Sequence, residues 1–263
     1  MPLSAATLAQ IDASQGWRRN RVEVLDTPDG RVLVKGQRAL RSGWGYRLLN
    51  GMAWLTGVPL LKAAPAYGGS QAQTIEATRL RALRAAGVLV PEVLHEAPDY
   101  LAMQYLGKRS LVDEIKLEEY KLSPAQCLRM WKTGLDALAD LHQRGQYLSQ
   151  AFARNMLWYE GQLWFIDFED DPLEVMDLTT AQMRDWFAYL YSCILFLHAL
   201  APQMLPIWKQ IVDAQSAAVS QMMHNNARHL TWLRLFRNRR SWGRDVVNLH
   251  HMGAFLATWL QTF

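Results

Sequence analysis

Residues 21–35 show the alternation of apolar and polar side chains that is typical of a β-hairpin. Two β-rich runs, RVEVLDT and GRVLVK, meet around Pro28-Asp29-Gly30. Proline presets a turn and glycine accepts a positive φ, so these residues favour a reversal between antiparallel strands. Residues 36–70 are rich in glycine and aromatic side chains and lack clean periodicity. This predicts an insertion that contains at most one short helix.

A helix is predicted over residues 71–86, where QAQTIEATRLRALRAA is rich in helix formers and is followed by Gly87. Residues 88–106 contain short apolar runs separated by Pro91 and Pro98, which is typical of one or two further antiparallel strands. The N-terminal part of the chain is therefore expected to form a small sheet with one helix.

The pattern becomes mostly helical after Gly107. Apolar residues recur every three or four positions after Ser123-Pro124 and predict one long helix; they are Leu128, Trp131, Leu135, Leu138 and Leu141. Residues 155–168 are the exception, because MLWYEGQLWFIDF alternates around Glu160-Gly161 as a second hairpin. The fold class is therefore α+β, with a β-rich lobe over residues 1–106, a linker near 106–109 and a mostly helical lobe over residues 107–263.

Composition narrows the class of protein. Half of the 263 residues are hydrophobic and a fifth are charged, which excludes disordered and collagen-like chains. The two cysteines are too few for a disulfide framework, and the first twenty residues lack the apolar core of a signal peptide, so we expect a cytoplasmic protein. The longest apolar stretch, residues 187–201, is shorter than the ~20 residues of a membrane-spanning helix, so integral insertion is not expected.

The net charge of +4 is unevenly distributed. Residues 31–75 hold six Lys or Arg and no acid, and residues 214–263 hold six Arg and one acid. Basic surface concentrated in two segments suits an anionic partner. RNA is one such partner, although no recognised RNA-binding motif accompanies the charge.

Four local motifs carry candidate chemistry. They are Val32-Leu33-Val34-Lys35 at a strand end, Glu76 on the next helix, residues 138–157 with LHQRG and Asn155, and Phe165-Ile166-Asp167-Phe168-Glu169 after the second hairpin. Their types and order resemble the protein-kinase-like superfamily. The resemblance covers roughly residues 20–200 and is nearest to small bacterial kinase-like proteins that phosphorylate heptose or Kdo sugars of the lipopolysaccharide core. It implies a two-lobed kinase-like fold.

The resemblance also implies roles for individual residues. Lys35 would hold the α- and β-phosphates of ATP, and Glu76 would pair with Lys35. Asn155 and Asp167 would bind the Mg²⁺ that bridges the β- and γ-phosphates. Each residue also has a plain structural reading: a solvated strand-end lysine, an exposed helical glutamate, and turn-forming Asn and Asp residues.

The resemblance breaks at Gln150, five residues before Asn155. The family pattern has an aspartate there, which accepts the proton of the substrate hydroxyl. Glutamine has no useful basicity, so a general-base contribution of roughly 10²–10⁴-fold should be lost. A carboxylate from the acidic run 169–171 could replace it, but the sequence does not place that run in space. The usual glycine-rich phosphate loop is absent as well.

Two functions therefore remain open. One is a phosphotransferase that uses ATP and Mg²⁺ on a hydroxyl of a lipopolysaccharide-core sugar or related envelope glycolipid. The other is a catalytically inactive pseudokinase, a scaffold that binds a protein partner or an anionic lipid. Basic segments 31–62 and 228–244 could face an anionic membrane surface, which would place the protein peripherally on the inner membrane. Alternatively, segment 228–244 is a core helix with solvated arginines.

The acid Asp185 has a predicted structural role. Arg184-Asp185-Trp186 is expected to open the most apolar helix of the chain. By the same resemblance, Asp185 would accept hydrogen bonds from the backbone of the catalytic loop. The alternative is a simple helix-start acid that the helix dipole favours.

Overall fold

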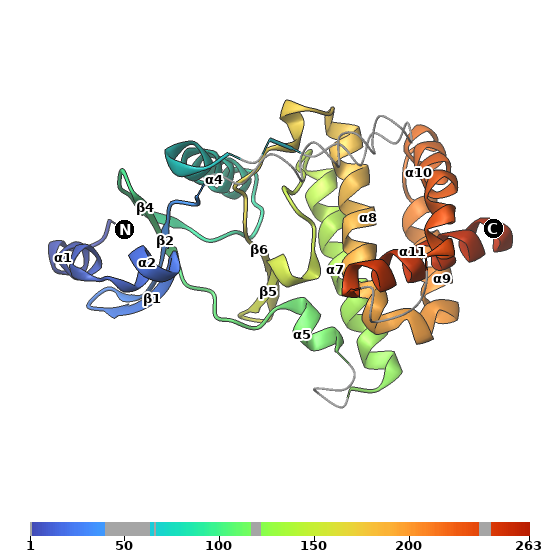
Figure 1. Cartoon of the computed structure of the whole chain (residues 1–263), viewed down its shortest axis with the longest axis horizontal. Helices are drawn as coiled ribbons and strands as arrows, with labels where there is room; N and C mark the ends of the chain where they lie inside the picture. Colours follow the sequence, from blue (N-terminus) through green and yellow to red (C-terminus); the bar gives the residue numbers. More distant parts are fainter. Residues whose placement is uncertain (1, 40–63, 66, 117–121, 237–242) are drawn as a thin grey trace.

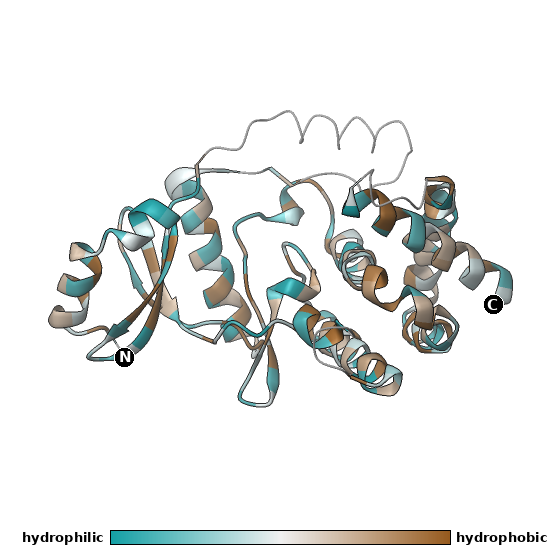
Figure 2. Ribbon diagram, turned by 60° about the horizontal axis from the view of Figure 1, so that its bottom comes forward, coloured by the Kyte–Doolittle hydropathy of each residue, from teal (hydrophilic) through white to brown (hydrophobic). Residues whose placement is uncertain are grey.

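The computed structural model describes residues 2–39, 64–65, 67–116, 122–236 and 243–263 of the chain. The fold is α+β, with a small four-stranded antiparallel sheet in the N-terminal part and a mostly helical C-terminal part (Figure 1). The two termini lie at opposite ends of the molecule in both Figure 1 and Figure 2. The predicted insertion 36–70 lies largely outside the described residues, as do residues 40–62 of basic segment 31–62 and residues 237–242 of basic segment 228–244.

The sheet has the strand order β1-β2-β4-β3. Its strands are β1 (Val22–Thr27), β2 (Gly30–Gly36), β3 (Val93–Glu96) and β4 (Tyr100–Gln104). β1 pairs with β2 from Val22 opposite Lys35 to Thr27 opposite Gly30, and Gly30 has the positive φ of 99° that the tight turn requires. The predicted hairpin over residues 21–35 is confirmed, and so are the strands predicted within residues 88–106.

Helices cover both faces of this sheet. Helices α1 (Ala5–Ala13) and α2 (Gly16–Asn20) place Ile11 and Trp17 against Val32, Val34, Tyr100 and Ala102. Helix α4 (Gly69–Ala85) packs Leu80 and Leu83 into a second cluster with Leu101 and Met103. Because successive residues of a strand face opposite sides, Lys35 lies on the α4 face of β2, opposite the face of Val32 and Val34. The helix predicted over residues 71–86 is confirmed and begins slightly earlier.

The C-terminal part contains helices α5 (Leu111–Ile115), α7 (Pro124–Gln143), α8 (Leu178–Leu197), α9 (Ala201–Asp213), α10 (Ala217–Leu230) and α11 (Arg244–Thr262). Short 3₁₀ turns η2 (Ala153–Asn155), η3 (Pro172–Glu174), η4 (His198–Leu200) and η5 (Thr231–Leu235) lie between them. The second predicted hairpin is confirmed as β5 (Met156–Tyr159) and β6 (Gln162–Phe165). Hydrophilic and hydrophobic segments alternate along the helices of both parts (Figure 2).

Helices α7 and α8 form the centre of the helical part. A capping box of Ser123 and Gln126 starts α7, with Pro124 in its first turn. Gly134 lets α8 approach closely, so that the hydroxyl of Tyr189 donates a hydrogen bond of 2.9 Å to the carbonyl of Trp131. The long helix predicted from the apolar repeat is therefore confirmed, and its buried face packs against α8.

The prediction that Arg184-Asp185-Trp186 opens the most apolar helix is wrong. Helix α8 begins at Leu178, where Asp177 is the N-cap and accepts a hydrogen bond from the backbone of Thr180. The first two turns of α8 are more polar than the rest, which hides the helix start from a search for apolar residues. Asp185 therefore lies inside the helix, too far from its N-terminus to be a helix-start acid.

Among the described residues, one helical run is long and apolar enough to cross a membrane by length and composition. It covers residues 178–213, which comprise α8, η4 and α9. A core helix of a globular protein passes the same test, and Trp186, Tyr189 and Cys193 of α8 are fully buried against protein neighbours. The run is longer than the predicted stretch 187–201 because the helix continues in both directions.

Candidate functional site

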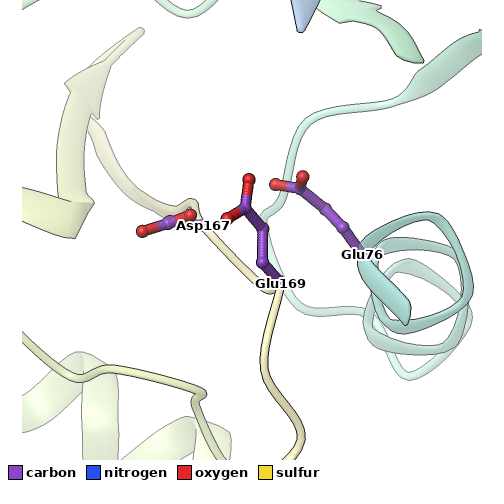
Figure 3. A group of neighbouring side chains, drawn as sticks. All are labelled: Glu76, Asp167 and Glu169. Atoms are coloured by element: carbon purple, nitrogen blue, oxygen red, sulfur yellow. The ribbon is translucent and has the colours of Figure 1, made fainter. Parts of the chain in front are cut away.

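The ammonium group of Lys35 is the centre of the candidate site. Its Nζ lies 2.8 Å from Oε1 of Glu76, 2.8 Å from Oε1 of Glu169 and 3.2 Å from Oδ1 of Asp167. Glu76 comes from α4, whereas Asp167 and Glu169 follow β6, and the three carboxylates face a common region (Figure 3). The predicted partner Glu76 is therefore in contact with Lys35, and two further carboxylates join it.

The local fold explains why Lys35 and Glu76 meet. Lys35 is near the end of β2, on the sheet face that α4 covers. Glu76 lies on the buried face of α4 with Ala72, Ala77 and Leu80, at helical spacing. The side chains of Lys35 and Glu76 are only 12% and 4% exposed. The readings of Lys35 as a solvated lysine and Glu76 as an exposed helical glutamate are thus excluded.

Two arginines complete a network of charges around Glu169. Nη1 of Arg38 lies 2.9 Å from Oε2 of Glu169, and its Nη2 lies 2.8 Å from Oδ1 of Asp170. Arg21, just before β1, also contacts Glu169. Burying a charged group costs free energy unless an opposite charge lies beside it. The ion pairs of Glu169 and Asp170 with the arginines therefore allow these carboxylates to be buried.

We call these residues the Lys35 cluster: Arg21, Lys35, Arg38, Glu76, Asp167, Glu169 and Asp170. The cluster has one more carboxylate than cations, which leaves a net negative charge suited to an added metal cation. The sequence interpretation missed Arg21 and Arg38. Arg38 lies in segment 31–75, which contains no acid, and this composition predicted a basic surface without indicating which arginine would enter the site.

Asp167 is the most open carboxylate in contact with Lys35. Its side chain is 38% exposed, compared with 6% for Glu169. Asp167 also has a φ of 70°, which is uncommon for a residue with a side chain but is tolerated best by Asn and Asp. Oxygen atoms of Glu76, Asp167 and Glu169 lie within 4.8 Å of one another. Since Glu76 and Glu169 are held by cations, Asp167 is the carboxylate best placed to receive a ligand.

The second hairpin places Asn155 and Asp167 at the same end. The carbonyl of Asn155 accepts a hydrogen bond of 3.0 Å from the backbone of Ile166, so residues 155 and 167 lie at the same end of the hairpin. The side chain of Asn155 is buried, and its Nδ2 donates to the carbonyl of Gln150 at 3.1 Å. Asn155 and Asp167 can both offer oxygen ligands, the type that Mg²⁺ prefers.

Asp185 supports the loop that precedes Asn155. Its Oδ2 accepts a hydrogen bond of 2.9 Å from the backbone of Leu148 and lies 3.0 Å from Nε2 of His142. Burial raises the pKa of the Asp185 carboxyl, because the charged form is poorly solvated inside the helical core. The predicted hydrogen bond from the loop backbone to Asp185 is confirmed.

Three side-chain contacts join this loop to the acidic run after Asp167. The Tyr147 hydroxyl donates to Oδ1 of Asp171 at 2.7 Å, and the Ser149 hydroxyl donates to the carbonyl of Asp170. The amide Nε2 of Gln150 lies 3.3 Å from Oδ2 of Asp170. The side chain of Gln150, which stands where the family pattern has an aspartate, is therefore beside a carboxylate.

No protein-family model matches the chain, and no curated protein matches it.

Proposed function

We propose that Lys35, Asn155 and Asp167 bind ATP and Mg²⁺ and that the protein, with a kinase-like two-lobed fold, transfers the γ-phosphoryl group to a hydroxyl. The observation that carries this proposal is the contact of the largely buried Lys35 ammonium with both Glu76 and Asp167. A lysine on a strand, a glutamate on the following helix and an aspartate after a distant hairpin are the parts that position nucleotide phosphates in kinases. Separate segments of the chain supply them here.

The donor set fits this ligand. An ammonium that Glu76 holds in one place presents fixed positive charge to phosphate oxygens, and the carboxylate and amide oxygens of Asp167 and Asn155 match the ligand preference of Mg²⁺. The metal, when bound, neutralises charge that develops on the phosphates. Phosphates would compete with Glu169 for Lys35 and Arg38, so nucleotide binding would loosen the contacts of Glu169.

The acceptor belongs to the proposal as well. The local resemblance of residues 76–94 favours a hydroxyl of a lipopolysaccharide-core sugar or related envelope glycolipid, at the cytoplasmic face of the inner membrane. On η5, Trp232 and Leu235 are exposed, Leu235 by 77%, and Arg234 between them is exposed too. Exposed apolar and basic side chains together suit an anionic membrane surface.

Vesicle co-sedimentation tests the membrane part of the proposal. The protein should sediment with vesicles that contain an anionic phospholipid and much less with neutral ones. The variant Trp232→Ser/Leu235→Ser should lower the bound fraction. Equal binding to both kinds of vesicle would count against an electrostatic membrane contact.

A second candidate, a pseudokinase that binds a partner without turnover, is favoured by one observation. The amide of Gln150 stands at the position of the general base, and an amide cannot take up the proton of a hydroxyl at neutral pH. The phosphotransferase requires both nucleotide binding and turnover, whereas the pseudokinase scaffold requires neither.

Thermal unfolding with and without Mg²⁺ and ATP tests the nucleotide site. A ligand that binds the folded state alone raises the free energy of unfolding, by about 2.7 kcal/mol at 100 times Kd, which corresponds to several degrees in Tm. The parent should show this rise and Asp167→Ala should lose most of it. Asp136→Ala is the matched control, since Asp136 is exposed and pairs with Lys132 on α7. A parent without any rise at millimolar ATP would contradict the proposal.

A further inference from the structure

We propose that Asp170 replaces the missing catalytic-loop aspartate and accepts the proton of the acceptor hydroxyl. This inference rests on the proposed phosphotransferase function and adds a further catalytic residue to it. The observation behind it is the contact of 3.3 Å between Oδ2 of Asp170 and Nε2 of Gln150, two residues 20 positions apart. A carboxylate thus lies beside the amide that occupies the base position.

Asp170 is held in a fixed position. Its Oδ1 lies 2.8 Å from Nη2 of Arg38, and its backbone carbonyl accepts a hydrogen bond from the Ser149 hydroxyl. These contacts leave Oδ2 turned toward Gln150. Because both carboxylate oxygens are held, Asp170 needs little reorientation to take up a proton.

The neighbouring carboxylates are engaged elsewhere. Glu169 is bound by Lys35, Arg38 and Arg21. Oδ1 of Asp171 accepts hydrogen bonds from the Tyr147 hydroxyl and from the backbone N–H of Leu173. The second of these bonds caps the N-terminus of η3. Asp170 is therefore the member of the acidic run that touches the loop residue at the base position.

The proposed step transfers the γ-phosphoryl group to the acceptor oxygen and the hydroxyl proton to Asp170. The oxygen of the acceptor hydroxyl forms a bond to the γ-phosphorus of ATP, and the bond from that phosphorus to the β,γ-bridging oxygen breaks. The bridging oxygen keeps the electron pair and leaves with ADP. The hydroxyl proton passes to Oδ2 of Asp170, which later releases it to water. The amide of Gln150 donates a hydrogen bond to Oδ2 and so orients the carboxylate.

The test measures ADP released from Mg²⁺ and ATP with water as the acceptor, together with the rise in Tm that the nucleotide causes. In Asp170→Asn, ADP release should fall by roughly 10²-fold or more, the contribution of a general base. The nucleotide-induced rise in Tm should remain as in the parent. The control Asp171→Asn changes the next carboxylate and should stay within about threefold of the parent in ADP release.

Rescue distinguishes a base from a structural residue. The double variant Gln150→Asp/Asp170→Asn moves the carboxylate to the position that the family pattern uses, and it should recover ADP release at least about tenfold over Asp170→Asn. If Asp170→Asn does not fold, Asp170→Glu decides the question. It keeps the negative charge opposite Arg38 but displaces the carboxylate, so ADP release should fall at least about tenfold while the nucleotide-induced rise in Tm remains.

Each other outcome has a definite meaning. Parental ADP release in Asp170→Asn overturns the inference and leaves the proposed function intact. Loss of the Tm rise in Asp170→Asn also overturns it, because Asp170 would then act in binding. A double variant that binds nucleotide without recovery overturns it as well. A parent that binds ATP and releases no ADP overturns it and favours the pseudokinase, whereas a parent that does not bind ATP contradicts the proposed function.

Discussion

Nζ of Lys35 lies 2.8 Å from Oε1 of Glu76, although 41 positions separate the two residues in the chain. The contact joins the sheet to α4 and fixes the ammonium at the centre of the Lys35 cluster. Because both side chains are nearly buried, the pair bears on stability as well as on phosphate binding.

Glu76→Gln is expected to lower the free energy of unfolding by about 1–3 kcal/mol. This loss of stability is smaller than for a buried ion pair without further partners, because Lys35 keeps its contacts with Glu169 and Asp167. Urea unfolding measures the change. The control Asp136→Asn breaks an exposed pair with Lys132 and should change stability by less than about 1 kcal/mol. Equal effects of the two changes would contradict a stabilising role of the buried pair.

Asp185→Ala is expected to destabilise more strongly, by about 3–5 kcal/mol, because it leaves the Leu148 amide and His142 without their buried partner. Asp185→Asn keeps an oxygen for the Leu148 amide and should lose less. The midpoints of urea unfolding for the two variants provide the comparison. If both behave like the parent, Asp185 does not hold the loop in place.

Local patterns carried most of the fold prediction. Both hairpins, the helix with Glu76 and the long helix α7 each depend on residues close in sequence, so alternation, turn residues and caps were enough to find them. The start of α8 was missed because its first turns are polar. Helices α1 and α2 were also missed, because their few buried residues, such as Ile11 and Trp17, give little periodicity.

The candidate site was predictable only in part. Lys35 and Glu76 were paired through the resemblance, and the hairpin brought Asn155 and Asp167 to one end as expected. The contacts of Arg38 with the acidic run and of Gln150 with Asp170 join segments 20 to 132 positions apart. No local pattern encodes such contacts, since they depend on how the sheet packs against the loop.

Gly134→Ala is expected to destabilise the protein by about 1–3 kcal/mol, although alanine favours helix over glycine by up to about 1 kcal/mol. A Cβ at position 134 would overlap the hydroxyl of Tyr189 and lie 2.8 Å from Cδ2 of Leu111. Tyr189→Phe removes that hydroxyl, so part of the loss should disappear when the two changes are combined. Urea unfolding of the single and double variants measures this coupling. Purely additive effects would show that the Tyr189 hydroxyl is not the obstacle.

Stability should fall in mild acid through His251. Burial, together with the nearby His198 and His250, lowers the pKa of His251 from 6.5 to about 4 in the folded state. The unfolded chain therefore binds more protons between pH 6.5 and 4, so the free energy of unfolding decreases as the pH falls through that range. Urea midpoints at pH 7.5 and 5 should differ more in the parent than in His251→Asn. An equal pH dependence in both proteins would contradict this assignment.

The nucleotide site is tested most directly by calorimetric titration of the protein with ATP in excess Mg²⁺. The parent and Asp136→Asn should both show saturable binding at one site. Asp167→Asn removes the carboxylate that is proposed to bind Mg²⁺ and should weaken the affinity for ATP in excess Mg²⁺ at least about tenfold, equivalent to about 1.4 kcal/mol. An absence of saturable binding in the parent at millimolar ATP, or equal affinity in Asp167→Asn, would contradict nucleotide binding by the Lys35 cluster.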